Sequence, residues 1–69
     1  MEKGIIEFTL NGRKNTYLRR IDVYGKPVST TNKTNAKKVK INETKKIIGL
    51  IIKEWGENNV KDIKFKKDE

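Results

Sequence analysis

One stretch of this chain has the periodicity of an amphipathic helix, and such a helix requires the remaining residues to form a second layer that covers its apolar face. Its apolar side chains recur at i, i+3 and i+4 spacing and form a single stripe: Thr44, Ile47, Ile48, Ile51, Ile52 and Trp55. Asn42 is a suitable N-cap before the stripe, and Gly56 is a suitable stop after it. A helix with one apolar face needs a second layer to pack against, so the rest of the chain is expected to form a sheet.

The sheet is predicted to begin with a β-hairpin. Residues 4–10 place Ile6, Phe8 and Leu10 on one face, which is typical of a half-buried strand. The dipeptide Asn11-Gly12 follows, and it tolerates positive φ at both central positions of a type I′ turn. The polar residues after it leave a longer loop open as an alternative.

A second strand is expected at residues 16–24, but neither of its faces is cleanly apolar, so its register stays open. The remaining elements are short strands at residues 28–31 and 38–41, an exposed loop at 31–35 and a closing strand at 60–66. The sequence therefore predicts an α+β fold: a small, mainly antiparallel sheet with one helix packed on one face. Residues 1–69 form a single small domain, of which residues 67–69 are expected to be frayed.

The residue types that are missing exclude most chemistry. The chain has neither cysteine nor histidine, so we expect no disulfide, no zinc site and no histidine-activated nucleophile. Its glycines are isolated and its carboxylates lack the spacing of a divalent-metal site. We therefore expect a protein that is not an enzyme, with no catalytic residue, no metal and no cofactor.

The apolar segments are too short for a membrane. The longest is residues 47–52, whereas a spanning helix needs roughly 20 apolar residues. The first residues also lack the basic and apolar regions of a secretion signal. We expect a cytoplasmic protein without a membrane partner.

The positive charge is concentrated in the middle of the chain. Residues 13–40 hold nine Lys and Arg side chains against one acid, Asp22, whereas residues 41–69 hold seven lysines against six acids. All three arginines, which bind phosphate well, lie in the middle segment. This asymmetry points to a polyanionic partner.

Cations interleaved with aromatic rings suit a nucleic acid, because cations meet phosphates and rings stack on bases or sugars. The candidate nucleic-acid-binding residues are Arg13, Lys14, Tyr17, Arg19, Arg20, Tyr24, Lys26, Lys33, Lys37 and Lys38. The alternative is a solvated lysine-rich surface in which the two tyrosines are ordinary strand packing. Because adjacent strand residues point to opposite faces, we expect only one of Arg19 and Arg20 on the sheet face that the helix leaves open.

Two resemblances accompany these patterns. The run from Asn15 to Pro27, with its Tyr…Ile-Asp…Gly-x-Pro order, resembles the arm-type DNA-binding domain of tyrosine integrases. That resemblance implies a three-stranded sheet lying in the major groove, with Arg13, Lys14, Tyr17, Arg19 or Arg20, and Lys26 nearest the DNA. The closing strand at 60–66 departs from that family.

The whole chain is also similar to small uncharacterised accessory proteins of phages and prophages in AT-rich Gram-positive bacteria. The shared pattern is a hairpin, a short strand at Ala36-Lys37-Lys38, a helix and a closing strand with Val60 and Ile63. This second resemblance implies no defined activity.

Three hypotheses about function follow. The first is a non-enzymatic accessory protein of phage or mobile-element origin that binds DNA or RNA through residues 13–40. The second is a small protein-binding module or inhibitor that occludes a host or phage enzyme, with an acidic-surfaced protein as its partner. The third is a homodimer, suggested by Gly49, which would allow close approach of another chain, and by Leu50, which lies off the main apolar stripe.

Overall fold

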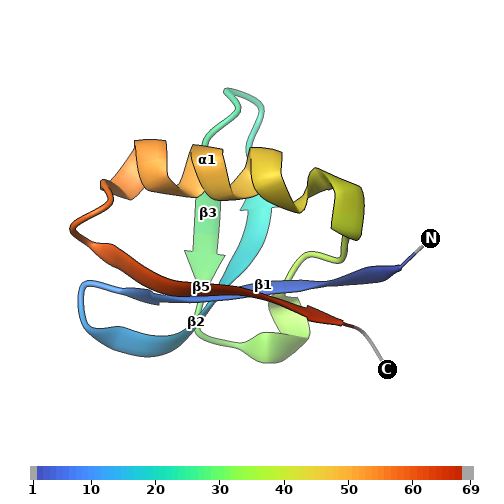
Figure 1. Ribbon diagram of the computed structural model, residues 1–69, viewed down its shortest axis with the longest axis horizontal. Helices are drawn as coiled ribbons and strands as arrows, with labels where there is room; N and C mark the ends of the chain where they lie inside the picture. Colours follow the sequence, from blue (N-terminus) through green and yellow to red (C-terminus); the bar gives the residue numbers. More distant parts are fainter. Residues whose placement is uncertain (1, 68–69) are drawn as a thin grey trace.

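The first strand is the centre of the sheet. The computed structural model describes residues 2–67, and in it β1 (Lys3–Leu10) pairs antiparallel with β5 (Val60–Lys67) from Gly4 to Leu10. On its opposite edge β1 has two partners in succession: β2 (Arg13–Ile21) beside its C-terminal half and β4 (Val39–Lys40) beside its N-terminal end. The fifth strand, β3 (Pro27–Thr30), pairs with β2 (Figure 1).

Helix α1 (Thr44–Trp55) covers one face of this sheet (Figure 1). The core between them consists of the buried side chains Ile6, Phe8, Leu18, Val39, Ile47, Ile51 and Val60. Trp55 packs at its border, with its ring centroid 5.7 Å from that of Phe8. The predicted α+β architecture with one helix on one sheet face is therefore confirmed.

The β1–β2 hairpin follows the prediction from its turn dipeptide. Asn11 has a φ of 52° and Gly12 a φ of 81°, both positive as a type I′ turn requires. Strand β2 begins directly after them, at Arg13, so the longer loop does not form.

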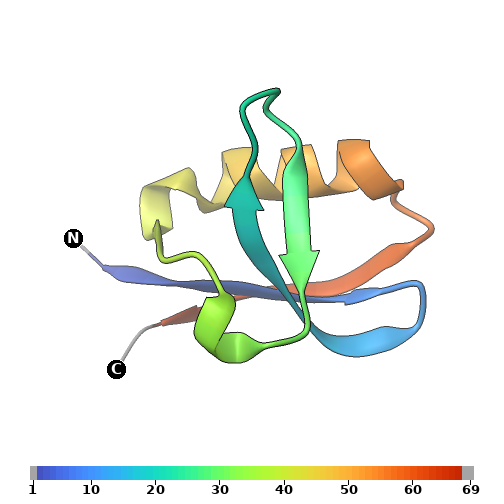
Figure 2. The ribbon, with the colours of Figure 1, turned by 180° about the vertical axis from the view of Figure 1, so that it is seen from behind.

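The second strand ends earlier than the predicted residue 24 because Asp22 starts a turn. Its Oδ1 accepts hydrogen bonds from the backbone N–H groups of Tyr24 and Lys26, each at 2.9 Å. Gly25 takes the positive φ of 79° that this turn needs. Strands β2 and β3 and the turn between them form an arm that rises past the helix (Figure 2).

Three irregularities curl the sheet. Each inserts an extra residue into one strand of a pair. In β2, Lys14 and Asn15 together lie opposite Thr9 of β1, and Arg19 has no partner in β3. In β5, Asp62 and Ile63 together lie opposite Phe8 of β1. Asn15 and Asp62 adopt positive φ, at 59° and 55°. β-Bulges of this kind increase the local twist, which gives the sheet its curvature.

The chain between β3 and the helix differs most from the prediction. Residues 31–35 contain a short 3₁₀ turn, η1 (Lys33–Asn35), capped by the side chain of Asn32. The segment Ala36-Lys37-Lys38 is not a strand. Instead the N–H of Lys37 donates to the carbonyl of Leu18 at 2.8 Å, so this segment bridges β2 to the short β4 beside β1.

Of the two predicted helix ends, the C-terminal one is confirmed and the N-terminal one is wrong. Asn42 is not the N-cap, because a 3₁₀ turn, η2 (Ile41–Glu43), precedes the helix and takes Asn42 into its interior. Glu43 occupies the cap position without a side-chain hydrogen bond. At the other end Gly56 stops the helix as predicted, and its N–H donates to the carbonyl of Ile52 at 2.7 Å.

The closing strand is one residue longer than predicted. Lys67, expected to begin a frayed tail, pairs with Gly4 in β1, and its Nζ lies 3.0 Å from Oε1 of Glu2. The other two residues of that predicted tail, 68 and 69, lie outside the described residues.

Candidate nucleic-acid interface

Arg19 and Arg20 both point away from the helix. Leu18 before them is wholly buried in the core, and Ile21 after them packs against it. The bulge at Arg19 adds one residue between these two inward positions, so both arginines are exposed on the opposite side. The prediction that only one would reach the helix-free face is wrong, because it assumed unbroken alternation along the strand.

Cations of β1 and β4 join the arginines on this side. Val39 points into the core, so its neighbour Lys40 points outward. Lys40 lies directly opposite Lys3, and paired residues of antiparallel strands share a face.

Strand β5 adds three more cations. Ile63 and Phe65 pack toward the core, which leaves Lys64 and Lys66 outward. These lysines and Lys61 lie opposite the outward-facing positions of β1. We call the exposed cations on the helix-free side the outer basic face: Lys3, Arg19, Arg20, Lys40, Lys61, Lys64 and Lys66.

One carboxylate is partly buried within the outer basic face. The side chain of Glu7 is 15% exposed, and its Oε2 lies 3.3 Å from Nζ of Lys66. On the other side Glu7 accepts a hydrogen bond from Tyr17, the residue opposite it in β2. Lys66, Glu7 and Tyr17 thus form a polar chain across three strands.

Tyr17 belongs to this internal chain and is not available for stacking. It is only 7% exposed, and burial together with the charge of Glu7 raises the pKa of its hydroxyl. Its predicted role in contacting bases or sugars does not fit that burial. The alternative, that Tyr17 is strand packing, agrees with the structure.

The remaining predicted residues divide between two regions. Lys14 lines a shallow depression with Lys64 and Asp62, and Lys37 is hydrogen bonded beside β2, next to Arg19. Lys33 lies in η1, which contacts β2, and Lys38 lies just before β4. Of these lysines, Lys14 lies beside the outer basic face, because it lines the same depression as Lys64.

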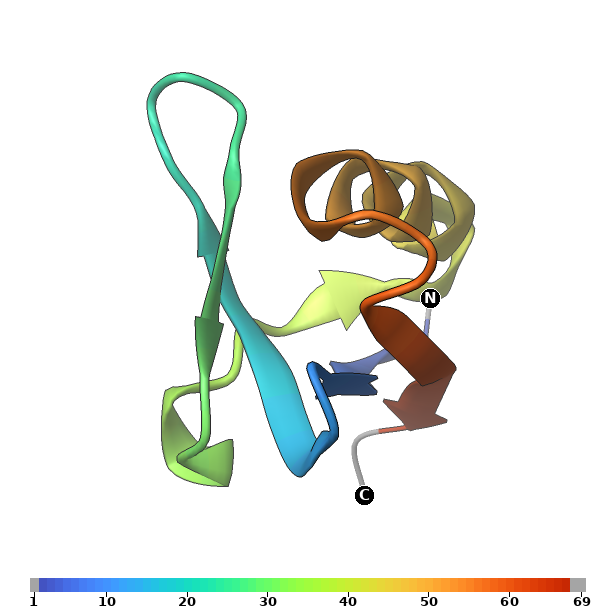
Figure 3. The same cartoon turned by 90° about the vertical axis from the view of Figure 1, so that its left-hand side faces the viewer.

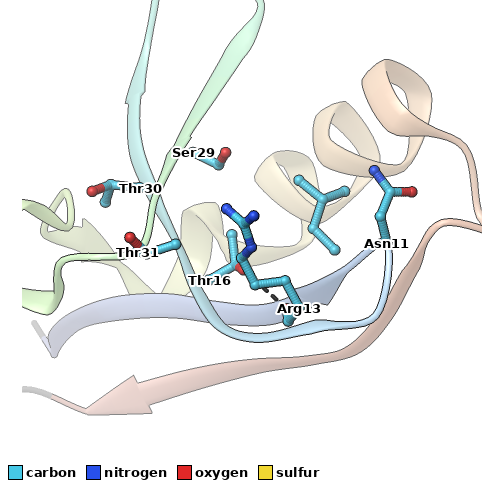
Figure 4. A pocket seen from close by; sticks show the side chains of 7 residues that line it. Asn11, Arg13, Thr16, Ser29, Thr30 and Thr31 are labelled. Atoms are coloured by element: carbon cyan, nitrogen blue, oxygen red, sulfur yellow. Dashed lines mark hydrogen bonds between the residues drawn. The ribbon is translucent and has the colours of Figure 1, made fainter.

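Arg13, Tyr24 and Lys26 lie apart from that face. Arg13 lines a groove of about 500 Å³ with Ser29 and Thr30 of β3, and its carbonyl accepts a hydrogen bond from Thr16 at 3.0 Å (Figure 4). Tyr24 and Lys26 lie in the turn at the tip of the β2–β3 arm. The middle segment therefore contributes to one face and also to the arm.

The helix side carries no comparable excess of charge. From residue 41 to residue 59 the chain holds three lysines, Lys45, Lys46 and Lys53, and three glutamates, Glu43, Glu54 and Glu57. The two sides of the molecule thus differ in charge, because the seven cations of the outer basic face outnumber the two acids beside them, Glu7 and Asp62. Four members of the outer basic face, Lys3, Lys61, Lys64 and Lys66, lie outside the basic segment 13–40 on which the sequence-based hypothesis rested, although the alternation in residues 60–66 places Lys64 and Lys66 outward.

Residues 2–67 contain no cluster of three or more acidic side chains that could hold a metal ion. Within the same residues no helix has the length and apolar character needed to cross a membrane. Compared with protein-family models, curated proteins and solved structures, the chain has no match.

Proposed function

We propose that this protein is a non-enzymatic, cytoplasmic accessory protein that binds nucleic acid through the outer basic face. One observation carries the proposal: seven cations from four strands lie on the sheet side away from the helix, while the helix side is balanced in charge. The sheet bends around the helix (Figure 3), so these cations lie on its outer side, a surface that can follow a phosphate backbone. Binding would be largely electrostatic and tolerant of sequence.

Fluorescence anisotropy with labelled DNA and RNA at several salt concentrations tests the proposal. Each phosphate contact is expected to contribute about 0.9 to the slope of log K against log salt on duplex DNA. Affinity should therefore fall steeply between about 50 and 200 mM salt. Absence of binding to both DNA and RNA at low salt would refute the proposal.

A pair of double variants separates this face from the net charge. Arg19→Glu with Arg20→Glu reverses two cations of the outer basic face. Lys45→Glu with Lys46→Glu makes the same charge change on the exposed side of the helix. We expect the arginine variant to lose binding and the lysine variant to retain most of it. Equal losses would assign binding to net charge alone, and capture of one acidic-surfaced protein that survives high salt would favour the inhibitor hypothesis.

A further inference from the structure

The tip of the β2–β3 arm carries two apolar side chains that are almost fully exposed. Val23 is 93% exposed and Tyr24 is 85% exposed. The turn that holds them is ordered by Asp22, whose Oδ1 accepts two backbone hydrogen bonds at 2.9 Å. An exposed aromatic ring on an ordered turn is a feature expected of a binding surface.

Tyr24 also forms one wall of a crevice between the arm and the helix. The crevice has a volume of about 280 Å³, and Figure 3 shows the arm and the helix that form its two sides. Its apolar surface comes from Pro27 at the start of β3 and Leu50 on the helix. Leu50, which lies off the core-facing stripe, is therefore on the side of the helix that faces the arm.

The polar lining of the crevice comes from both sides. Lys26 from the arm and Lys53 from the helix supply two cations, and Glu54 supplies one carboxylate. The lining thus combines an aromatic ring, apolar side chains and two cations, which match the parts of a single nucleotide: a flat base and its phosphate. Glu54 can accept a hydrogen bond from an N–H group on the Watson–Crick edge of a base, an edge that is free only when the base is unpaired.

We infer that this crevice binds one unpaired nucleotide of a bound strand, with the base stacked on Tyr24 and the flanking phosphates near Lys26 and Lys53. The inference rests on the proposed function and gives it a substrate class: single-stranded nucleic acid, or a duplex with an open base. The outer basic face holds the backbone of the strand, and the arm tip engages a base.

Anisotropy with a labelled single strand and with the duplex of the same sequence tests this inference. The wild-type protein is expected to bind the single strand more tightly. Tyr24→Ala should weaken single-strand binding roughly 5- to 150-fold, the range for loss of one base–aromatic stack, and leave duplex binding unchanged. Tyr24→Phe should keep the single-strand affinity, because the ring is retained.

A matched lysine pair tests the helix side of the crevice. Lys53→Ala should weaken single-strand binding, because Lys53 lines the crevice. Lys45→Ala should not weaken it, because Lys45 is an exposed lysine of the same helix that does not line the crevice. Circular dichroism checks that each variant is folded.

The outcomes separate the two proposals. If Tyr24→Ala has no effect, or weakens both ligands equally, while the Arg19 and Arg20 reversal still abolishes binding, the crevice inference fails and the proposed function stands. Tighter binding of the duplex by the wild-type protein also overturns the inference. If no nucleic acid binds, both fail, and the arm tip becomes a candidate anchor for a protein partner.

Discussion

Gly4 and Gly49 differ in the space around their Cα atoms. A Cβ atom on Gly4 would overlap the carbonyl of Lys66 and the ring of Phe65 in β5, whereas a Cβ atom on Gly49 would meet nothing within 4 Å. We expect Gly4→Ala to lower the free energy of unfolding by about 1–3 kcal/mol through overpacking. Gly49→Ala should raise it by about 1 kcal/mol, because alanine favours the helix.

Urea unfolding followed by the fluorescence of the single tryptophan, Trp55, measures both changes, since its ring packs beside Phe8. If Gly4→Ala were as stable as the wild type, β1 and β5 would have to lie further apart than described. If Gly49→Ala were destabilising, Gly49 would have to contact another chain, as in a homodimer, and the mass in solution would show it.

The hydroxyl of Tyr17 should titrate above its usual value of 10.0, because burial and the charge of Glu7 raise its pKa and Lys66 only partly offsets them. In the Tyr24→Phe variant Tyr17 is the only tyrosine, so the tyrosinate absorbance reports it alone. Glu7→Gln in that background should lower the midpoint by removing the charge. A midpoint at or below 10.0 would contradict the described burial.

The raised pKa of Tyr17 also links folding to pH. Below pH 10.0 Tyr17 is neutral in both the folded and unfolded states, so its contribution to stability is complete. Above that pH the unfolded chain ionises first, and the contribution is lost as pH rises through the folded pKa. Tyr17→Phe should lack this component of the alkaline loss of stability.

At the scale of elements, the bulges determine which side chains share a face. Asn15 lies in the first bulge of β2 with a φ of 59°. Asn15→Gly should change the free energy of unfolding by less than about 0.5 kcal/mol, because glycine adopts this conformation freely. Asn15→Val should lower it by about 1–2 kcal/mol, since a branched side chain is strained there.

Chemical unfolding of both Asn15 variants checks this, with Asn58→Val as the control. Asn58 is exposed in the turn after the helix and does not have a positive φ, so valine there should be nearly neutral. Equal effects of valine at the two positions would mean that the bulge conformation costs nothing.

Local signals in the sequence predicted the elements that depend on neighbouring residues. The helix stripe, the Gly56 stop and the Asn11-Gly12 turn each depend on residues that are close together in the sequence, and all three predictions were confirmed. The bulge at Arg19 could not be read from the sequence, because an extra strand residue has no distinctive residue type. The N-cap prediction at Asn42 was wrong because the preceding strand leads straight into a 3₁₀ turn.

At the scale of the whole molecule, charge is segregated by face, whereas the sequence suggested segregation by segment. The middle segment supplies Arg19, Arg20 and Lys40 to the outer basic face, but β5 supplies as many cations. That contribution depends on the pairing of β1 with β5, which joins residues far apart in the chain. A count of charges along the sequence therefore could not show that the cations of the middle segment and those of β5 share one face.

The net charge of +8 also predicts how salt affects stability. Raising salt from about 0.01 to 0.15 M shortens the screening length from roughly 30 to 8 Å, which weakens repulsion among the cations. The melting temperature should therefore rise with salt, while nucleic-acid affinity falls. Thermal unfolding by circular dichroism measures the first effect. The Lys45→Glu, Lys46→Glu variant, which has two fewer positive and two more negative charges and therefore a net charge of +4 instead of +8, should show a smaller rise. A melting temperature that fell with salt would instead mean that the Lys66–Glu7 and Lys67–Glu2 ion pairs outweigh the repulsion.

The pairing of β1 with β5 has a consequence for the order of events during synthesis. Gly4 and Lys67 face each other, although the ribosome makes one long before the other. Until β5 emerges, one full edge of β1 has no partner, and the apolar side chains Ile6 and Phe8 lack part of their cover. The hairpin and the helix can form early from local contacts, but the sheet can close only after β5 has been made.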